Sequence, residues 1–280
     1  TYPFYHQDHA PVREQTTAEG HAVRALYLYT AMADVARLNG DAQLAGVCKA
    51  LFDDIVSKKM YITGGTGSTY HGEAFTFAYD LPNFYAYSET CAAIALAFFC
   101  DRLAKAENRA VYHEIFERAL YNNILAGESA DGKGFFYVNP LEFHENVYEY
   151  NEGLKTKLFC PIPERVEVFD CSCCPPNLTR FIESVGGYIY GTEGDFVYIN
   201  QYISSSVQIG GAKIEIDSEM PYGGRASLRV SGDCRLKLRV PAWNSGVSMK
   251  VNGKVVSPAA EEGYISLDCR GETKIALDFH

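Results

Sequence analysis

Three cysteines fall within four residues in the segment Asp170-Cys171-Ser172-Cys173-Cys174-Pro175-Pro176-Asn177. The two prolines suit the first turn of a helix, where the missing N–H groups would have had no partner in any case. Cys173 and Cys174 should therefore lie just before a helix N-terminus, where free N–H groups and the helix dipole favour a thiolate. We interpret this segment as half of a metal site.

Glu89 and Cys91 supply the matching half of that predicted site. Zinc in proteins is usually held by four ligands of Cys, His, Asp or Glu type, and Glu89, Cys91, Cys173 and Cys174 form such a set. Residues two apart point in different directions on a regular helix, but both can converge at an N-cap. A thiolate held by the metal is also a candidate nucleophile. The spacing alone leaves open thiols that merely pack.

Glu73 is the carboxylate of a glycine-rich stretch, residues 61–73. The stretch lacks the phosphate-binding pattern GxxxxGK[ST], and no strand clearly precedes it, which argues against nucleotide binding. A retaining glycosidase needs an acid beside the leaving oxygen and a nucleophile across the sugar. Glu73 suits the first role, and a cysteine thiolate could replace the usual second carboxylate. The alternatives are a solvated loop residue for Glu73 and a hydrogen-bonded structural histidine for His21.

Apolar periodicity predicts the elements that position these side chains. Helical spacing indicates helices from the capping box Thr16-x-x-Glu19 to residue 39, at about 42–58, from about 89, at about 108–125 and after Pro176. After about residue 194 the pattern changes to short alternating runs, and Asn252-Gly253 indicates a hairpin. We therefore predict an α + β multidomain chain, with a helical domain at 1–193 and a β-sandwich domain at 194–280.

Composition excludes several partners. The net charge is −10 and no basic stripe is present, so nucleic acid is not an expected partner. No apolar run is long enough to span a membrane. The nine cysteines show no regular disulfide spacing, which predicts a reducing compartment and a cytoplasmic protein. The oligomeric state stays open, with a homodimer as the candidate assembly.

Several motifs in order resemble glycoside hydrolase family 127, and the likeness runs from about His6 to about Trp243. They are Tyr61-Ile62-Thr63-Gly64-Gly65, His71-Gly72-Glu73-Ala74-Phe75-Thr76, Tyr79-Asp80-Leu81-Pro82-Asn83, Glu89-Thr90-Cys91-Ala92-Ala93 and Cys173-Cys174-Pro175-Pro176-Asn177. The resemblance implies the C-terminal part of an (α/α)6 catalytic barrel followed by a β-sandwich domain that is incomplete here, because family members are much longer than this chain.

The same resemblance implies a function and a set of roles. It implies a retaining β-L-arabinofuranosidase that acts on a carbohydrate substrate with Zn²⁺ as cofactor. Glu73 would be the acid/base and Cys173 the nucleophile. The zinc ligands would be Glu89, Cys91, Cys173 and Cys174, and the sugar contacts His21, Glu117 and Tyr137. The alternatives are a non-catalytic, zinc-stabilised carbohydrate-binding or structural domain and a metal-free thiol enzyme.

Overall fold

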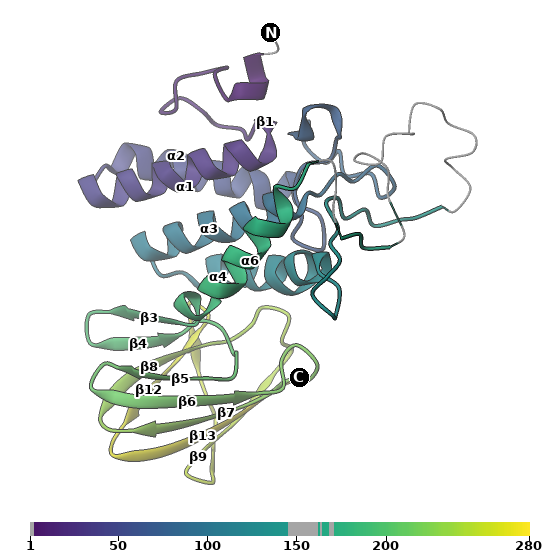
Figure 1. The fold of residues 1–280 in the computed structure, drawn as a ribbon. Helices are drawn as coiled ribbons and strands as arrows, with labels where there is room; N and C mark the ends of the chain where they lie inside the picture. Colours follow the sequence, from purple (N-terminus) through teal and green to yellow (C-terminus); the bar gives the residue numbers. More distant parts are fainter. Residues whose placement is uncertain (1–2, 145–161, 163, 168–170) are drawn as a thin grey trace. The chain divides into compact units, whose positions relative to one another are not determined.

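A computed structural model describes residues 3–144, 162, 164–167 and 171–280 (Figure 1). The chain divides into two compact units, one of residues 1–107 with 115–182 and one of residues 108–114 with 183–280. The first unit is helical and the second is built of strands, as the change of periodicity predicts. None of the helices in the described part of the chain combines the length and apolar character that a membrane span needs.

The helical unit is built around α1 and α3, which pack along each other. The α-helices of the described residues are α1 (Ala22–Asn39), α2 (Ala42–Asp54), α3 (Thr90–Ala106), α4 (Ala110–Ala119) and α6 (Cys174–Ser184). Residues 110–114 of α4 and 183–184 of α6 belong to the other unit. α3 is apolar on nearly every side and its first half is fully buried, with Ala92 to Ala97 at 0 % exposure. A helix buried all round belongs in the centre of a core, so its N-terminus is a fixed point for side chains placed there. Closure of the helices into an (α/α)6 barrel stays a prediction.

The first predicted helix begins later than its capping box indicates. α1 starts at Ala22 with His21 as its N-cap, and Gly20 adopts a φ of 74°. Gly20 and His21 instead form the short strand β1 (Gly20–His21), which pairs with β2 (Ala74–Phe75). The prediction of a helix start at Thr16 is therefore wrong, because tertiary strand pairing overrides a local capping signal.

The second unit contains two sheets that share one apolar core. The six-stranded sheet has the order β10-β9-β13-β7-β6-β5, and the five-stranded sheet has the order β11-β12-β8-β4-β3. The strands are β3 (Tyr190–Glu193), β4 (Phe196–Ile199), β5 (Ser205–Ile209), β6 (Ala212–Ser218), β7 (Arg225–Ser231), β8 (Cys234–Arg239), β9 (Val247–Val251), β10 (Lys254–Val256), β11 (Ala260–Glu261), β12 (Tyr264–Cys269) and β13 (Glu272–Phe279). Asn252 and Gly253 both have positive φ between β9 and β10, which confirms the predicted hairpin.

Candidate active site

The pairing of β1 with β2 brings His21 to Glu73. His21 lies opposite Ala74 in the register, and Glu73 ends the 3-10 turn η3 (His71–Glu73) directly before β2. Gly72 and Glu73 have φ values of 69° and 51°, so this turn folds the chain sharply. The result is a contact of 2.8 Å between His21 Nε2 and Glu73 Oε2. His21 Nδ1 accepts from the Arg24 backbone N–H, so in the neutral ring Nε2 carries the proton and donates it to Glu73.

Glu73 accepts two further hydrogen bonds, both from tyrosine hydroxyls. Tyr87 donates to Glu73 Oε1 at 2.8 Å and Tyr137 donates to the same oxygen at 3.0 Å. The hydrogen bond from His21, more than those from the tyrosines, lowers the pKa of Glu73 and outweighs the effect of its burial. The substrate-free site therefore favours the carboxylate form. A freely solvated Glu73 is excluded, because this side chain is 24 % exposed and held by three donors.

The two tyrosines are positioned by main-chain contacts between residues 87–90 and 137–139. The Asn139 N–H donates to the Tyr87 carbonyl at 3.2 Å, and the Thr90 N–H donates to the Tyr137 carbonyl at 3.0 Å. Glu89 forms a bridge with Val138 between these two bonds. The segment that carries Tyr137 is therefore fastened to the start of α3, where Glu89 and Cys91 lie.

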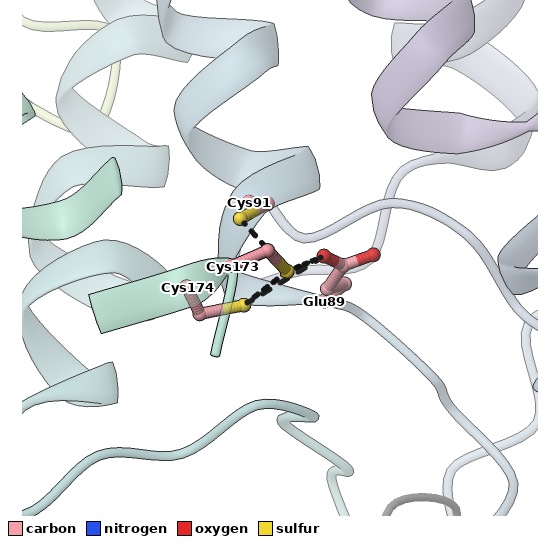
Figure 2. A group of neighbouring side chains, drawn as sticks. All are labelled: Glu89, Cys91, Cys173 and Cys174. Atoms are coloured by element: carbon pink, nitrogen blue, oxygen red, sulfur yellow. Dashed lines mark hydrogen bonds between the residues drawn. The ribbon is translucent and has the colours of Figure 1, made fainter. Parts of the chain in front are cut away.

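Four side chains converge at the N-termini of α3 and α6 (Figure 2). Glu89 is the N-cap of α3 in an extended conformation and Cys91 is the second residue of that helix, so the two converge as predicted. Cys174 is the first residue of α6 and Cys173 directly precedes it. The ligand atoms of Glu89, Cys91, Cys173 and Cys174 all lie within 4.8 Å of one another.

Cys173 occupies the centre of this cluster. Its sulfur lies 3.7 Å from the sulfurs of both Cys91 and Cys174, 3.4 Å from Glu89 Oε1 and 3.1 Å from the Tyr137 hydroxyl. Hydrogen bonds from Cys174 and then Cys91 lower the pKa of the Cys173 thiol to about 2. Neighbouring thiols that donate to the Cys173 sulfur therefore favour its thiolate form.

The other members of the cluster favour their neutral forms when no cation is present. Burial raises the pKa of Glu89, with the negative charge of Cys173 as the next cause. The hydrogen bond to Cys173 raises the pKa of Cys91, and burial raises that of Cys174. Glu89 Oε2 is buried and has no hydrogen-bond partner among the described residues, which is costly unless another group satisfies it. A thiol-rich donor set with an unsatisfied carboxylate oxygen fits a metal ion, and the cluster could hold one.

Tyr137 connects the cluster to Glu73. Its single hydroxyl contacts both Glu73 Oε1 at 3.0 Å and the Cys173 sulfur at 3.1 Å. The carboxylate and the sulfur therefore lie next to the same hydroxyl group. Cys171 is exposed, and its sulfur lies 3.9 Å from the same hydroxyl.

The structure brings together most of the residues that the sequence singled out. Contacts join His21, Glu73 and Tyr137 to the four-residue cluster. Glu117 lies buried on α4 at 6 % exposure, and its role as a sugar contact stays a prediction. Sequence reasoning missed Tyr87, because one tyrosine among 20 carries no distinguishing signal. Of the cysteines considered, Cys160 lies outside the described residues.

Two family models match the chain in sequence. Residues 2–187 match the model described as β-L-arabinofuranosidase, GH127 catalytic domain, and residues 196–280 match the GH127 middle domain. A non-reducing end β-L-arabinofuranosidase of Bifidobacterium longum subsp. longum is 38% identical over 289 residues, covering 99% of this chain and 43% of that protein.

Solved structures give the same likeness. A GH127 β-L-arabinofuranosidase from Geobacillus stearothermophilus T6 matches with a TM-score of 0.91 and 42% identity, over 99% of this chain and 45% of that one. A second GH127 β-arabinofuranosidase matches with a TM-score of 0.88 and 36% identity, again over 99% and 45%. The chain thus spans less than half the length of these relatives.

Proposed function

The chain belongs to glycoside hydrolase family 127, and from this membership we propose that its protein is a retaining glycosidase. The substrate we propose is a glycan or glycoconjugate that ends in β-L-arabinofuranose or a related furanose. The observation that carries the proposal is the single Tyr137 hydroxyl that contacts both Glu73 and Cys173. Because both groups contact one hydroxyl, this observation supports a retaining mechanism in which the Cys173 thiolate replaces the second carboxylate that such enzymes usually have.

Cys173 would act as the nucleophile. Its sulfur attacks the anomeric carbon, and the new C–S bond forms as the glycosidic C–O bond breaks. Glu73 donates its proton to the departing oxygen in this step. In the second step Glu73 takes a proton from water, the water oxygen attacks the same carbon, and the C–S bond breaks to return the Cys173 thiolate.

Glu73 must change its protonation state between these two steps. The hydrogen bonds of the substrate-free site favour its carboxylate, which is the form that the second step uses. A sugar that fills the site removes water from Glu73, and burial raises the pKa of a carboxyl group. The Tyr137 hydroxyl has one proton and can donate it to only one partner. When that proton turns to the Cys173 sulfur, Glu73 loses one of its three donors and binds a proton more readily.

We propose that the cluster holds zinc through Glu89, Cys91, Cys173 and Cys174. This ion accepts a set of four thiolate and carboxylate ligands. Zinc bound there would keep the thiols ionised and so support the thiolate form of Cys173 at neutral pH. Cys174 and Cys91 would serve only as ligands, and Cys173 must stay free enough to reach the sugar. His21, Tyr137 and Glu117 would contact the sugar itself.

Labelling with an L-arabinofuranose-based electrophile tests this proposal. The reagent should modify Cys173 and spare Cys174, Cys91 and Cys171, as read by mass spectrometry of the labelled peptide. Cys173→Ser should remove the label. A label on Cys171 or on Glu89 would move the nucleophile and overturn the mechanism. Bound zinc without labelling or turnover would favour a non-catalytic, zinc-stabilised domain instead.

A further inference from the structure

Two cysteines lie directly opposite each other in the five-stranded sheet of the second unit. Cys234 is the first residue of β8, Cys269 is the last residue of β12, and the two are partners in the antiparallel register. Opposite residues of an antiparallel pair share one face of the sheet, and here the Cys269 thiol donates a hydrogen bond to the Cys234 sulfur. Both cysteines are free thiols.

The spacing of the two strands suits a disulfide between these cysteines. Opposite residues of an antiparallel pair have Cα atoms roughly 4.5–5.5 Å apart, and a disulfide usually joins Cα atoms roughly 4.4–6.8 Å apart. Both residues stand at the end of the β8–β12 ladder. A small backbone adjustment there disturbs fewer neighbouring pairs than it would in the middle of the sheet.

The turns beside the two cysteines are tied together by hydrogen bonds. Asp233, directly before Cys234, accepts from the Gly271 N–H at 2.8 Å, and the Gly232 N–H donates to the Gly271 carbonyl at 3.0 Å. These bonds join the start of β8 to the chain just after Cys269. The two sulfurs are therefore held close to each other before any bond forms between them, which favours an intramolecular reaction.

The two thiols differ in their access to solvent. Cys269 is 1% exposed and belongs to the apolar core, whereas Cys234 is partly exposed and packs at the edge of that core. A small reagent can therefore reach Cys234 but not Cys269. Burial raises the pKa of both thiols, that of Cys269 to about 12. Because the thiolate is the reactive form, we expect slow reaction at neutral pH and faster reaction in mildly alkaline solution.

We propose that Cys234 and Cys269 form a reversible cross-strand disulfide by exchange with a low-molecular-weight disulfide such as oxidised glutathione. The Cys234 thiolate attacks one sulfur of that reagent, which forms a mixed disulfide and releases one small thiolate. The Cys269 thiolate then attacks the Cys234 sulfur and releases the second. The two protein thiols lose two electrons and two protons, and the reagent is reduced to two thiols.

This disulfide would link β8 to β12 covalently only when the protein meets an oxidising solution. The site lies in the strand-rich unit and uses no residue of the candidate active site, so the inference does not depend on the proposed function.

Tryptic mapping of the full-length protein tests the pair, because peptides 230–235 and 255–270 contain one cysteine each. The protein is incubated with oxidised glutathione at about pH 8.5, near the ordinary pKa of a thiol. It is then quenched in acid, alkylated in denaturant and digested without reduction. Mass spectrometry should find the two peptides linked, with a mass two hydrogen atoms below their sum. Dithiothreitol should separate them again.

Two matched variants test the order of the reaction. Cys269→Ala should accumulate glutathione on Cys234, because the thiol that displaces it is gone. Cys234→Ser should leave Cys269 unmodified, because that thiol is buried. Unlinked peptides in the wild type, under conditions in which Cys269→Ala takes up glutathione, would overturn the pair. Linkage of Cys234 to any other cysteine, or glutathione on Cys269 in Cys234→Ser, would also contradict it.

Discussion

Glu73 takes its three hydrogen bonds from three separate segments of the chain, which carry His21, Tyr87 and Tyr137. A carboxyl group held this firmly can deliver a proton to one defined position. We expect Glu73→Gln to lower kcat on substrates with poor leaving groups by about 10²–10⁴-fold. Activated aryl glycosides should lose much less, because their leaving groups need little protonation. Equal losses on both classes would argue against an acid role for Glu73.

Tyr137 and Tyr87 offer a matched pair of hydroxyls. Both donate to Glu73, and the Tyr137 hydroxyl also lies 3.1 Å from the Cys173 sulfur. We expect Tyr137→Phe to slow labelling of Cys173 by the sugar electrophile several-fold, because the thiolate loses a donor. Tyr87→Phe should leave the labelling rate close to that of the wild type. Both labelling rates can be measured by stopping the reaction at set times and quantifying the labelled peptide by mass spectrometry. Similar slowing in the two variants would contradict a direct effect of the Tyr137 hydroxyl on the Cys173 sulfur.

The metal cluster depends on the way in which two helices begin. Glu89 and Cys91 converge because Glu89 is still extended at the N-cap of α3, and Cys173 and Cys174 lie where α6 begins at its two prolines. We expect one zinc ion per chain. Loss of a side chain that only hydrogen-bonds a metal ligand weakens metal affinity roughly 10–100-fold. Replacing a ligand itself, in Cys91→Ser or Cys174→Ser, should weaken zinc binding at least as much. Cys100→Ser is the control, because Cys100 is a buried cysteine of α3 outside the cluster. Metal analysis after dialysis against a graded chelator measures this, and equal retention in all variants would exclude the cluster as the metal site.

Local signals predicted those elements that depend on local chemistry. Pro175 and Pro176 indicated the start of α6, Asn252-Gly253 indicated the β9–β10 hairpin, and the convergence of Glu89 and Cys91 followed from an N-cap. The capping box at Thr16 failed, because the pairing of β1 with β2 joins residues more than 50 positions apart and leaves no local trace.

The contacts within the candidate site were less predictable than its members. The motifs named Glu73, Cys173 and the other cluster residues, but the hydrogen bonds of Tyr87 and Tyr137 depend on main-chain contacts between distant segments. Nor could the sequence show that neighbouring thiols donate to Cys173 and so favour its thiolate form. These features arise from tertiary packing.

At the scale of the whole molecule, the strand-rich unit includes a short helical segment from much earlier in the chain. Residues 108–114 belong to the same compact unit as residues 183–280. Arg239 is fully buried, and it donates to the Asn200 carbonyl at 2.6 Å and to Glu114 at 3.1 Å. Glu114 also accepts from the Ala242 N–H at 3.0 Å. A buried charge is tolerated only when paired and hydrogen-bonded, so this segment is part of the structure of that unit.

His113 lies in this segment and makes the stability of the unit depend on pH. Burial, and next the charge of Arg239, lower the pKa of His113 to about 3 from its usual 6.5. The folded protein therefore keeps this ring neutral, whereas the unfolded chain binds a proton below about pH 6.5. The stabilisation is complete above that pH and is lost as the pH falls from 6.5 towards 3. The loss from this residue approaches ~1.4 kcal/mol per pH unit.

We expect His113→Gln to reduce this dependence. Glutamine can keep a donor for Asn108 Oδ1, which lies 2.7 Å from His113 Nε2, but it takes up no proton on unfolding. The free energy of unfolding of both proteins should be measured in urea between pH 7 and about pH 4.5, the range in which histidine protonation dominates over that of ordinary carboxylates. The wild type should lose stability more steeply than the variant as the pH falls. Identical slopes would show that His113 binds a proton as readily in the folded protein as in the unfolded chain, and would contradict the lowered pKa of His113.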